Sequence, residues 1–213
     1  MIELIKNTSG LTYGFMERTN VDAAYRKFGV GGAFGGTLRD MIEKLAALPL
    51  EFSPGTRWNY SVSSDVLGYL VEQISGQAFD EYLHERIFAP LGMSDTGFTV
   101  PPEKLERFAT NYTRRVDGSL KVEDEPYSSI YSKPRTFLSG GGGLVSTASD
   151  YLRFCSMLLG SGEFEGARLL GRKTVDLMIR NHLPGGRDLA SLSSALFVEA
   201  PYEGFGFGLG FSV

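Results

Sequence analysis

Apolar residues recur every three or four positions, the spacing of an amphipathic helix, in several stretches of the chain. The predicted helices cover residues 37–48, 64–75, 79–88, 147–159 and 173–180. Two of them begin with a capping-box pair, Thr37 with Asp40 and Thr147 with Asp150. Gly76 suits the position just after the second helix, where the backbone often turns left-handed. The pattern therefore favours a largely helical protein.

The C-terminal stretch follows a different period. Its apolar side chains alternate with glycine and share one side, namely Phe205, Phe207, Leu209, Phe211 and Val213. A period of two predicts a strand over 205–213, and the glycines indicate close approach by another element. Residues 101–138 are the least regular and predict loops with short strands.

Composition excludes several classes of protein. Of the 213 residues, 42% are hydrophobic and 22% are charged, which is ordinary for a globular protein. The net charge is −4 and no five consecutive residues are basic, so we expect no nucleic-acid partner. No run of 18 apolar residues occurs, so the sequence predicts no transmembrane segment.

The sequence also offers little to a metal or cofactor. One cysteine, Cys155, and two histidines, His84 and His182, are too few for a metal cluster. The first histidine is expected on a helix surface, and the second at a helix end, where it can cap carbonyls. The glycine run 140–143 lacks the Lys-Ser/Thr of a phosphate loop, so it predicts a tight loop before a helix. We therefore expect no metal and no cofactor.

The most informative stretch is 52–65, where a Pro54-Gly55 turn leads into Trp58 and Tyr60 and then a predicted helix. Taken alone, these aromatic residues are better explained as core side chains that precede a helix. A Gly-x-Ser-x-Gly nucleophile motif is absent from the sequence. The stretch therefore needs support from elsewhere in the chain.

Four blocks, taken together, carry a family resemblance. They are Ser53-Pro54-Gly55 with Trp58-x-Tyr60-Ser61 and Asp65-Val66-Leu67-Gly68, Asn7-Thr8-Ser9-Gly10-Leu11, Pro90-Leu91-Gly92-Met93 with Thr96-Gly97-Phe98, and Gly141-Gly142-Gly143-Leu144-Val145-Ser146-Thr147-Ala148-Ser149-Asp150. In this order they resemble the serine β-lactamase-related hydrolases, which include class C β-lactamases, DD-peptidases and family VIII carboxylesterases. The blocks span nearly the whole chain.

The resemblance implies an α/β (α+β) protein with the β-lactamase/transpeptidase-like fold, here mostly its helical domain plus part of the antiparallel sheet. Residues 1–213 would form a partial domain. About 1–140 would be the mostly helical and loop region, and about 141–213 would return toward the α/β domain and end in a strand. Family motifs expected before and after these blocks are missing, so we expect an internal fragment of a longer hydrolase.

Family members use a serine in Ser-x-x-Lys as nucleophile and a tyrosine in Tyr-x-Asn/Ser for proton transfer. None of the seven lysines follows a serine by three residues, so the nucleophile motif is absent. The resemblance makes Tyr60 the catalytic residue and Ser61 and Val62 substrate-binding residues. Penicillin-interacting members have Asn where Val62 stands, and Val62 can form no side-chain hydrogen bond.

These residues favour hydrolysis of short-chain carboxylic esters, and the partner expected is a small-molecule ester or β-lactam substrate. The chain alone is expected to be inactive because it lacks the nucleophile motif. Two alternatives stay open: a β-lactamase or D-amino-acid peptidase or amidase, and a non-catalytic scaffold of the same fold. Oligomeric state and a cytoplasmic or periplasmic location also stay open.

Overall fold

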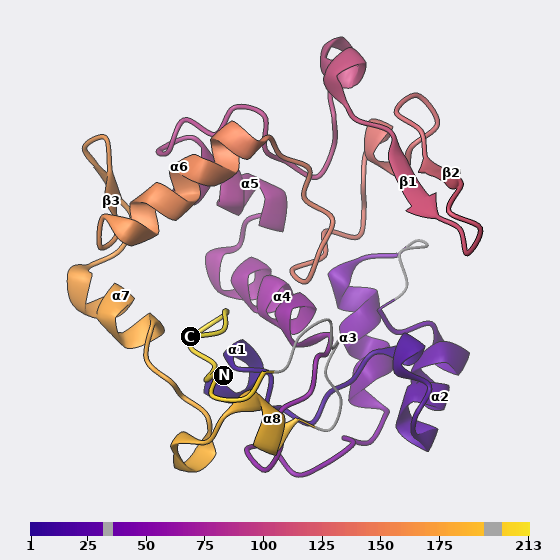
Figure 1. Cartoon of the computed structure of the whole chain (residues 1–213), viewed down its shortest axis with the longest axis vertical. Coiled ribbons are helices and arrows are strands. Elements are labelled where there is room, and N and C mark those ends of the chain that lie inside the picture. The colour runs from indigo at the N-terminus through magenta and orange to yellow at the C-terminus, as the bar shows by residue number, and fades with distance from the viewer. Residues whose placement is uncertain (32–35, 194–201) are drawn as a thin grey trace.

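The chain is described by a computed structural model that covers residues 1–31, 36–193 and 202–213. The α-helices of these residues are α1 (Ile2–Ile5), α2 (Asn20–Phe28), α3 (Leu38–Ala46), α4 (Ser63–Ser75), α5 (Phe79–Leu83), α6 (Ala148–Leu159), α7 (Arg172–Met178) and α8 (Leu189–Leu192). The strands are β1 (Asn111–Arg114), β2 (Leu120–Asp124), β3 (Glu163–Phe164) and β4 (Ala167–Arg168). Short 3-10 turns lie at Gly14–Met16, Pro102–Arg107, Ile130–Ser132 and Pro184–Gly186. Figure 1 shows α4 near the centre of the molecule, with the other helices around it.

The five predicted helices are present, with ends that follow the predicted signals. At α3, Thr37 accepts a hydrogen bond from the backbone of Asp40 and the reciprocal bond is also made. At α6, Thr147 Oγ1 accepts from the backbone nitrogen of Asp150 at 3.1 Å. Gly76 ends α4 with a φ of 71°, as its lack of a Cβ permits. The predicted helix over 79–88 divides into α5 and a π-helical turn, His84–Phe88.

Helix α2 was not predicted, although it has a capping box of its own. Thr19 accepts from the backbone of Asp22, and the Asp22 side chain accepts from the backbone of Thr19. Asp22 is fully buried and also accepts from Thr12 Oγ1 at 2.8 Å. The Thr-x-x-Asp spacing was therefore the signal that could have located this helix.

The predicted strand over 205–213 is wrong, because the segment turns back on itself. Gly206 N donates to Val213 O at 2.8 Å, and Gly208 N donates to Phe211 O at 2.8 Å. Gly210, with a φ of 102°, makes the reversal possible without a Cβ clash. The segment is attached to the end of α7, where Leu209 N donates to Met178 O at 2.9 Å.

Two small antiparallel sheets are formed by the described residues. β1 pairs with β2, with Tyr112 opposite Val122, and this hairpin confirms the short strands predicted within 101–138. β3 pairs with β4 directly after α6. With its helices and these small sheets the molecule is α+β, as predicted.

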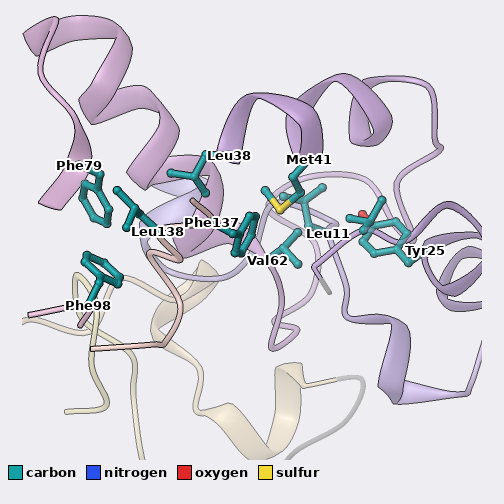
Figure 2. Close-up of a cluster of buried hydrophobic side chains, with 10 residues drawn as sticks. Leu11, Tyr25, Leu38, Met41, Val62, Phe79, Phe98, Phe137 and Leu138 are labelled. Carbon is teal, nitrogen blue, oxygen red and sulfur yellow. The ribbon is translucent and has the colours of Figure 1, made fainter. Parts of the chain in front are cut away.

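The main core is a row of apolar side chains that α3 and α4 cover. Figure 2 shows it running from Phe79 and Phe98 at one end, past Val62 in the middle, to Tyr25 at the other. Val62 and Tyr25 have no solvent exposure at all. The row fixes the start of α4, where Val62 lies just before the first helical residue.

A second set of contacts attaches the start of α6 to the loop over residues 95–97. Asp150, at the start of α6, accepts from the backbone of Asp95 at 2.8 Å and from Thr96 Oγ1 at 2.9 Å. Gly97 and Val145 form an antiparallel bridge beside these bonds. Two of the four blocks noted in the sequence therefore contact each other directly.

Candidate functional site

A cavity of about 580 Å³ opens between four segments that are distant in the sequence. Its walls are largely aromatic, with Phe15, Trp58, Tyr60, Tyr202 and Phe207 among the lining residues. Polar lining comes from Asn7, Ser64 and Ser212. A second apolar cluster, around Trp58 and Phe207, holds the C-terminal segment against the segment that contains Trp58, and the centroids of these two rings are 5.5 Å apart. A small apolar ligand with few polar groups suits such walls.

Tyr60, the expected catalytic residue, lies at this cavity. It belongs to the extended segment just before α4, and its side chain is 37% exposed. Its ring centroid is 5.1 Å from that of Tyr13, which stacks on Phe15 at 4.7 Å. The phenol is thus accessible while its ring is supported by a second aromatic side chain.

Asp65 connects the start of α4 to the glycine loop. Its carboxylate accepts from Gly141 N at 3.3 Å and from Ser139 Oγ. Asp65 is only 2% exposed, and this burial raises the pKa of its carboxyl above the ordinary value. The loop approaches so closely that a Cβ on Gly140 would lie 2.0 Å from Ser64 O.

Tyr13 is the half-buried neighbour of both Tyr60 and Asp65. Burial, followed by the charge of Asp65 and then by Tyr60, raises the pKa of the Tyr13 phenol well above its ordinary value. Tyr13 is therefore a neutral phenol at any physiological pH. It supports Tyr60 by ring contact rather than by charge.

The structure places the other two expected site residues away from the cavity surface. Ser61 is 3% exposed, and its hydroxyl bonds Asn7 Oδ1 at 3.1 Å and Ser63 Oγ at 2.8 Å. Val62 is fully buried in the main core. Neither side chain presents surface to a ligand in this structure, so each acts on the site through its neighbours.

Asn59 is a residue of the site region that sequence reasoning missed. It is 1% exposed, and its amide nitrogen donates to Leu11 O at 3.0 Å and to Glu51 Oε2 at 2.9 Å. Arg18 donates to its oxygen at 2.9 Å. Burial raises the pKa of Glu51, the carboxylate of this group. The position of Asn59 between Trp58 and Tyr60 was the available signal for a side chain that fixes this segment.

Lys6 and His182 have structural partners. Lys6 is buried, forms an ion pair with Glu3 at 3.3 Å and donates to the backbone oxygen of His182 at 3.4 Å. His182 Nε2 donates to Leu177 O at 2.7 Å near the end of α7, which confirms the predicted capping. His84 is exposed, as expected.

Neither a metal-binding group of side chains nor a membrane-spanning helix is found in the described part of the chain. No three acidic, histidine or cysteine side chains there gather as they would around a metal ion. None of the helices there is both long enough and apolar enough to cross a bilayer.

Comparison with known proteins identifies the group to which these features belong. The family model described as Beta-lactamase matches residues 1–212. Protein Rv1367c of Mycobacterium tuberculosis is 38% identical over 212 residues, which are 99% of this chain and 50% of that protein. Esterase EstB of Burkholderia gladioli is 33% identical over 169 residues, 70% of this chain and 42% of that protein. The chain thus spans about half the length of the curated relatives it matches or less.

Solved structures of similar fold cover almost all of this chain. EstCE1, described as a hydrolase with promiscuous acyltransferase activity, matches with a TM-score of 0.79 at 24% identity, over 99% of this chain and 55% of that one. Unliganded simvastatin synthase (LovD) from Aspergillus terreus matches with a TM-score of 0.75 at 28% identity, over 99% and 52%. These matches confirm the predicted β-lactamase/transpeptidase-like fold.

Proposed function

Because the chain belongs to the Beta-lactamase family, a group with esterase, acyltransferase and peptidase members, we propose that it is part of a serine hydrolase of short-chain carboxylic esters. The reaction proceeds through an acyl-serine intermediate. The nucleophilic serine and its lysine are supplied by sequence outside these 213 residues, which contain no Ser-x-x-Lys. The observation that most directly supports the proposal is the exposed Tyr60 phenol in an aromatic cavity.

Tyr60 acts as the proton carrier of this reaction. It takes the proton of the serine hydroxyl as that oxygen attacks the ester carbonyl, and returns it to the alcohol that leaves. An isolated phenol has a pKa of about 10, so only about one in a thousand is ionised at neutral pH. A cationic lysine beside it would favour the phenolate, and none of the described lysines lines the cavity. On its own the 213-residue chain is therefore expected to be inactive.

Two features support an ester over a β-lactam. The cavity walls are aromatic and offer few polar partners, which suits an ester better than an amide-rich substrate. The position two residues after Tyr60 is filled by the buried Val62, so no amide contacts the ligand from there. Ser61 and Val62 serve this site as positioning residues that fix Tyr60 against the core.

Acyl transfer to an alcohol is a second candidate, and a specific observation favours it. Monacolin J acid methylbutanoyltransferase of Aspergillus terreus is among the relatives of this chain. Transfer and hydrolysis share the acyl-enzyme and differ only in whether an alcohol or water attacks it. An apolar cavity that limits water access would favour the alcohol.

Turnover of matched substrates by the complete natural gene product tests the proposal. We expect p-nitrophenyl butyrate to be hydrolysed with a kcat/KM at least about tenfold above that for a cephalosporin or a D-Ala-D-Ala peptide. When an alcohol is added as acceptor, the amount of new ester formed measures acyl transfer. Preferred turnover of the cephalosporin or the peptide would replace the ester assignment by one of those substrates. No turnover of any of them would leave a non-catalytic scaffold.

A further inference from the structure

Three buried serine hydroxyls form a continuous row that ends at Asn7. Ser9 Oγ and Ser63 Oγ lie 2.7 Å apart, and Ser63 Oγ and Ser61 Oγ lie 2.8 Å apart. Ser61 Oγ is 3.1 Å from Asn7 Oδ1. The row therefore links the interior of the molecule to a side chain in the wall of the Tyr60 cavity.

The direction of donation along the row follows from its inner end. Ser9 Oγ already accepts from Leu11 N at 3.4 Å, and within the described residues its only acceptor is Ser63 Oγ. Ser9 therefore donates to Ser63, Ser63 donates to Ser61, and Ser61 donates to Asn7 Oδ1. The opposite direction would leave the Ser9 proton without an acceptor in a side chain that is 8% exposed, at a cost in stability.

This arrangement leaves the amide nitrogen of Asn7 with two N–H donors to spare. Across 1–31, 36–193 and 202–213, the hydrogen bond of the Asn7 side chain is the one that its oxygen accepts from Ser61, and its nitrogen forms none. The backbone is fixed as well, because Asn59 N donates to Asn7 O at 2.9 Å and Asn7 N donates to Leu4 O at 3.1 Å. Its φ of 55° lies in the left-handed region, which Asn tolerates better than most residues. The donor is therefore held in place before any ligand binds.

We propose that Asn7 is a substrate-binding residue whose amide nitrogen donates a hydrogen bond to a second carbonyl oxygen in the acyl chain of the substrate. The acyl chain is the part that stays bound through both halves of the reaction, so a fixed donor in the wall can act on it throughout. The part of this inference that concerns the reaction rests on the proposed function, whereas the part that concerns ligand binding does not depend on it. Preferred substrates are then short esters with an oxo group in the acyl chain.

Ligand binding by the 213-residue chain tests this without catalysis. Trp58 is the only tryptophan of the chain and lines the same cavity, so its fluorescence reports occupancy. The probes are two aryl ketones of equal shape, inert to hydrolysis, one with a second carbonyl in its chain and one with a methyl-bearing carbon there. We expect the diketone to bind about tenfold more tightly, the ratio for one neutral hydrogen bond.

Variants of Asn7 separate contact from support. Asn7→Asp keeps the oxygen that accepts from Ser61 and replaces the donor by an acceptor, so the preference for the diketone should disappear. Asn7→Gly also tolerates the left-handed backbone and should remove the preference in the same way. Asn111→Asp, the same change on the exposed strand β1, should retain it.

Two results would overturn the inference: equal binding of both ketones by the unchanged chain, or a preference that survives in both Asn7 variants. Activity of the complete gene product on matched oxo and methyl p-nitrophenyl esters then addresses the reaction. If the diketone preference depends on Asn7 but no ester is hydrolysed, the proposed function fails while the binding role stands. If the complete gene product hydrolyses esters without preferring the oxo ester, the proposed function stands and the role of Asn7 in substrate binding fails.

Discussion

Asp65 is a carboxylate with almost no access to solvent, and it attaches the glycine loop to the start of α4. It accepts hydrogen bonds from the glycine loop while sitting in the first turn of α4. Burial of a charge is costly, and this cost outweighs the hydrogen bonds in setting the direction of its pKa. Asp65 therefore lowers stability at neutral pH, while its hydrogen bonds attach the glycine loop beside Tyr13.

The raised pKa of Asp65 predicts the direction in which the stability difference between the unchanged protein and Asp65→Asn changes with pH. The folded protein binds the Asp65 proton more tightly than the unfolded chain, whose carboxyl titrates near about 3.9. Stability from this group is therefore full below that value and is lost as pH rises through the folded-state pKa. Urea unfolding from pH 4 upward should show the free energy of unfolding of the unchanged protein falling relative to that of Asp65→Asn. A constant difference would contradict this.

Asp40→Asn is the matched control with the opposite sign. Its hydrogen bonds from Thr37 lower the pKa of the Asp40 carboxyl, so its contribution is present above the unfolded pKa and lost as pH falls. The unchanged protein should therefore lose stability relative to Asp40→Asn as pH falls below about 4, whereas above that value the difference should stay constant. The two variants shift in opposite directions only if burial dominates at Asp65.

At the residue level the sequence singled out Tyr60 as the expected catalytic residue but did not indicate which residues surround it. The Trp-x-Tyr-Ser resemblance depends on neighbouring residues only, so it can be recognised in the sequence without knowledge of the fold. The hydrogen bond between Asn7 and Ser61 joins residues that are 54 positions apart in the sequence, and only the fold brings them together. The burial of Val62 likewise depends on α3 and on Phe137, which no spacing around position 62 encodes.

Among the elements, the glycine loop over 139–143 is packed closely against the start of helix α4, near Ser64 and Asp65. The loop is packed against the α4 N-terminus without room for a side chain at Gly140, whereas Gly142 has no atom within 4 Å of where a Cβ would be. Two glycines of one run therefore have different roles. The run is a close backbone approach at one end and an open loop in the middle.

Gly140→Ala should destabilise the protein by about 1–3 kcal/mol, because the new methyl group must displace backbone. Gly142→Ala, the control two residues away, should stay within about 0.5 kcal/mol of the unchanged protein. Urea unfolding followed by circular dichroism measures both. Equal effects of the two substitutions would contradict the close approach seen at Ser64.

Element prediction succeeded where the local signals were unopposed. Caps and helical spacing at α3, α4 and α6 match the structure because these helices bury one face each. The failure at 205–213 has a physical cause: alternation encodes two faces but not a partner strand. Glycine at 210 allowed a turn in place of an extended backbone.

The whole molecule exposes more surface than its mass requires. Its accessible surface is 12482 Å², whereas a monomer of 23.3 kDa is expected to expose about 9,700 Å². Large apolar side chains contribute to this excess, among them Phe15, Phe28, Leu159 and Phe205. Exposed apolar surface of this kind favours association with other surfaces.

We predict that the isolated 213-residue chain self-associates. Sedimentation velocity over about a hundredfold range of concentration should show a sedimentation coefficient that rises with concentration, as mass action requires. Phe205→Ser, at a side chain that is 48% exposed, should weaken the association. A single monomeric species at every concentration would show that the excess surface is tolerated in water.

The substitution Tyr60→Phe tests most directly whether the Tyr60 cavity is the site of acyl transfer. In the complete gene product, kcat/KM for p-nitrophenyl butyrate should fall by about a hundredfold or more, as expected when a proton carrier is removed. Tyr151→Phe, at a 62% exposed position on α6, should leave it unchanged. If Tyr60→Phe retained the activity of the unchanged enzyme, the cavity would not be the catalytic site.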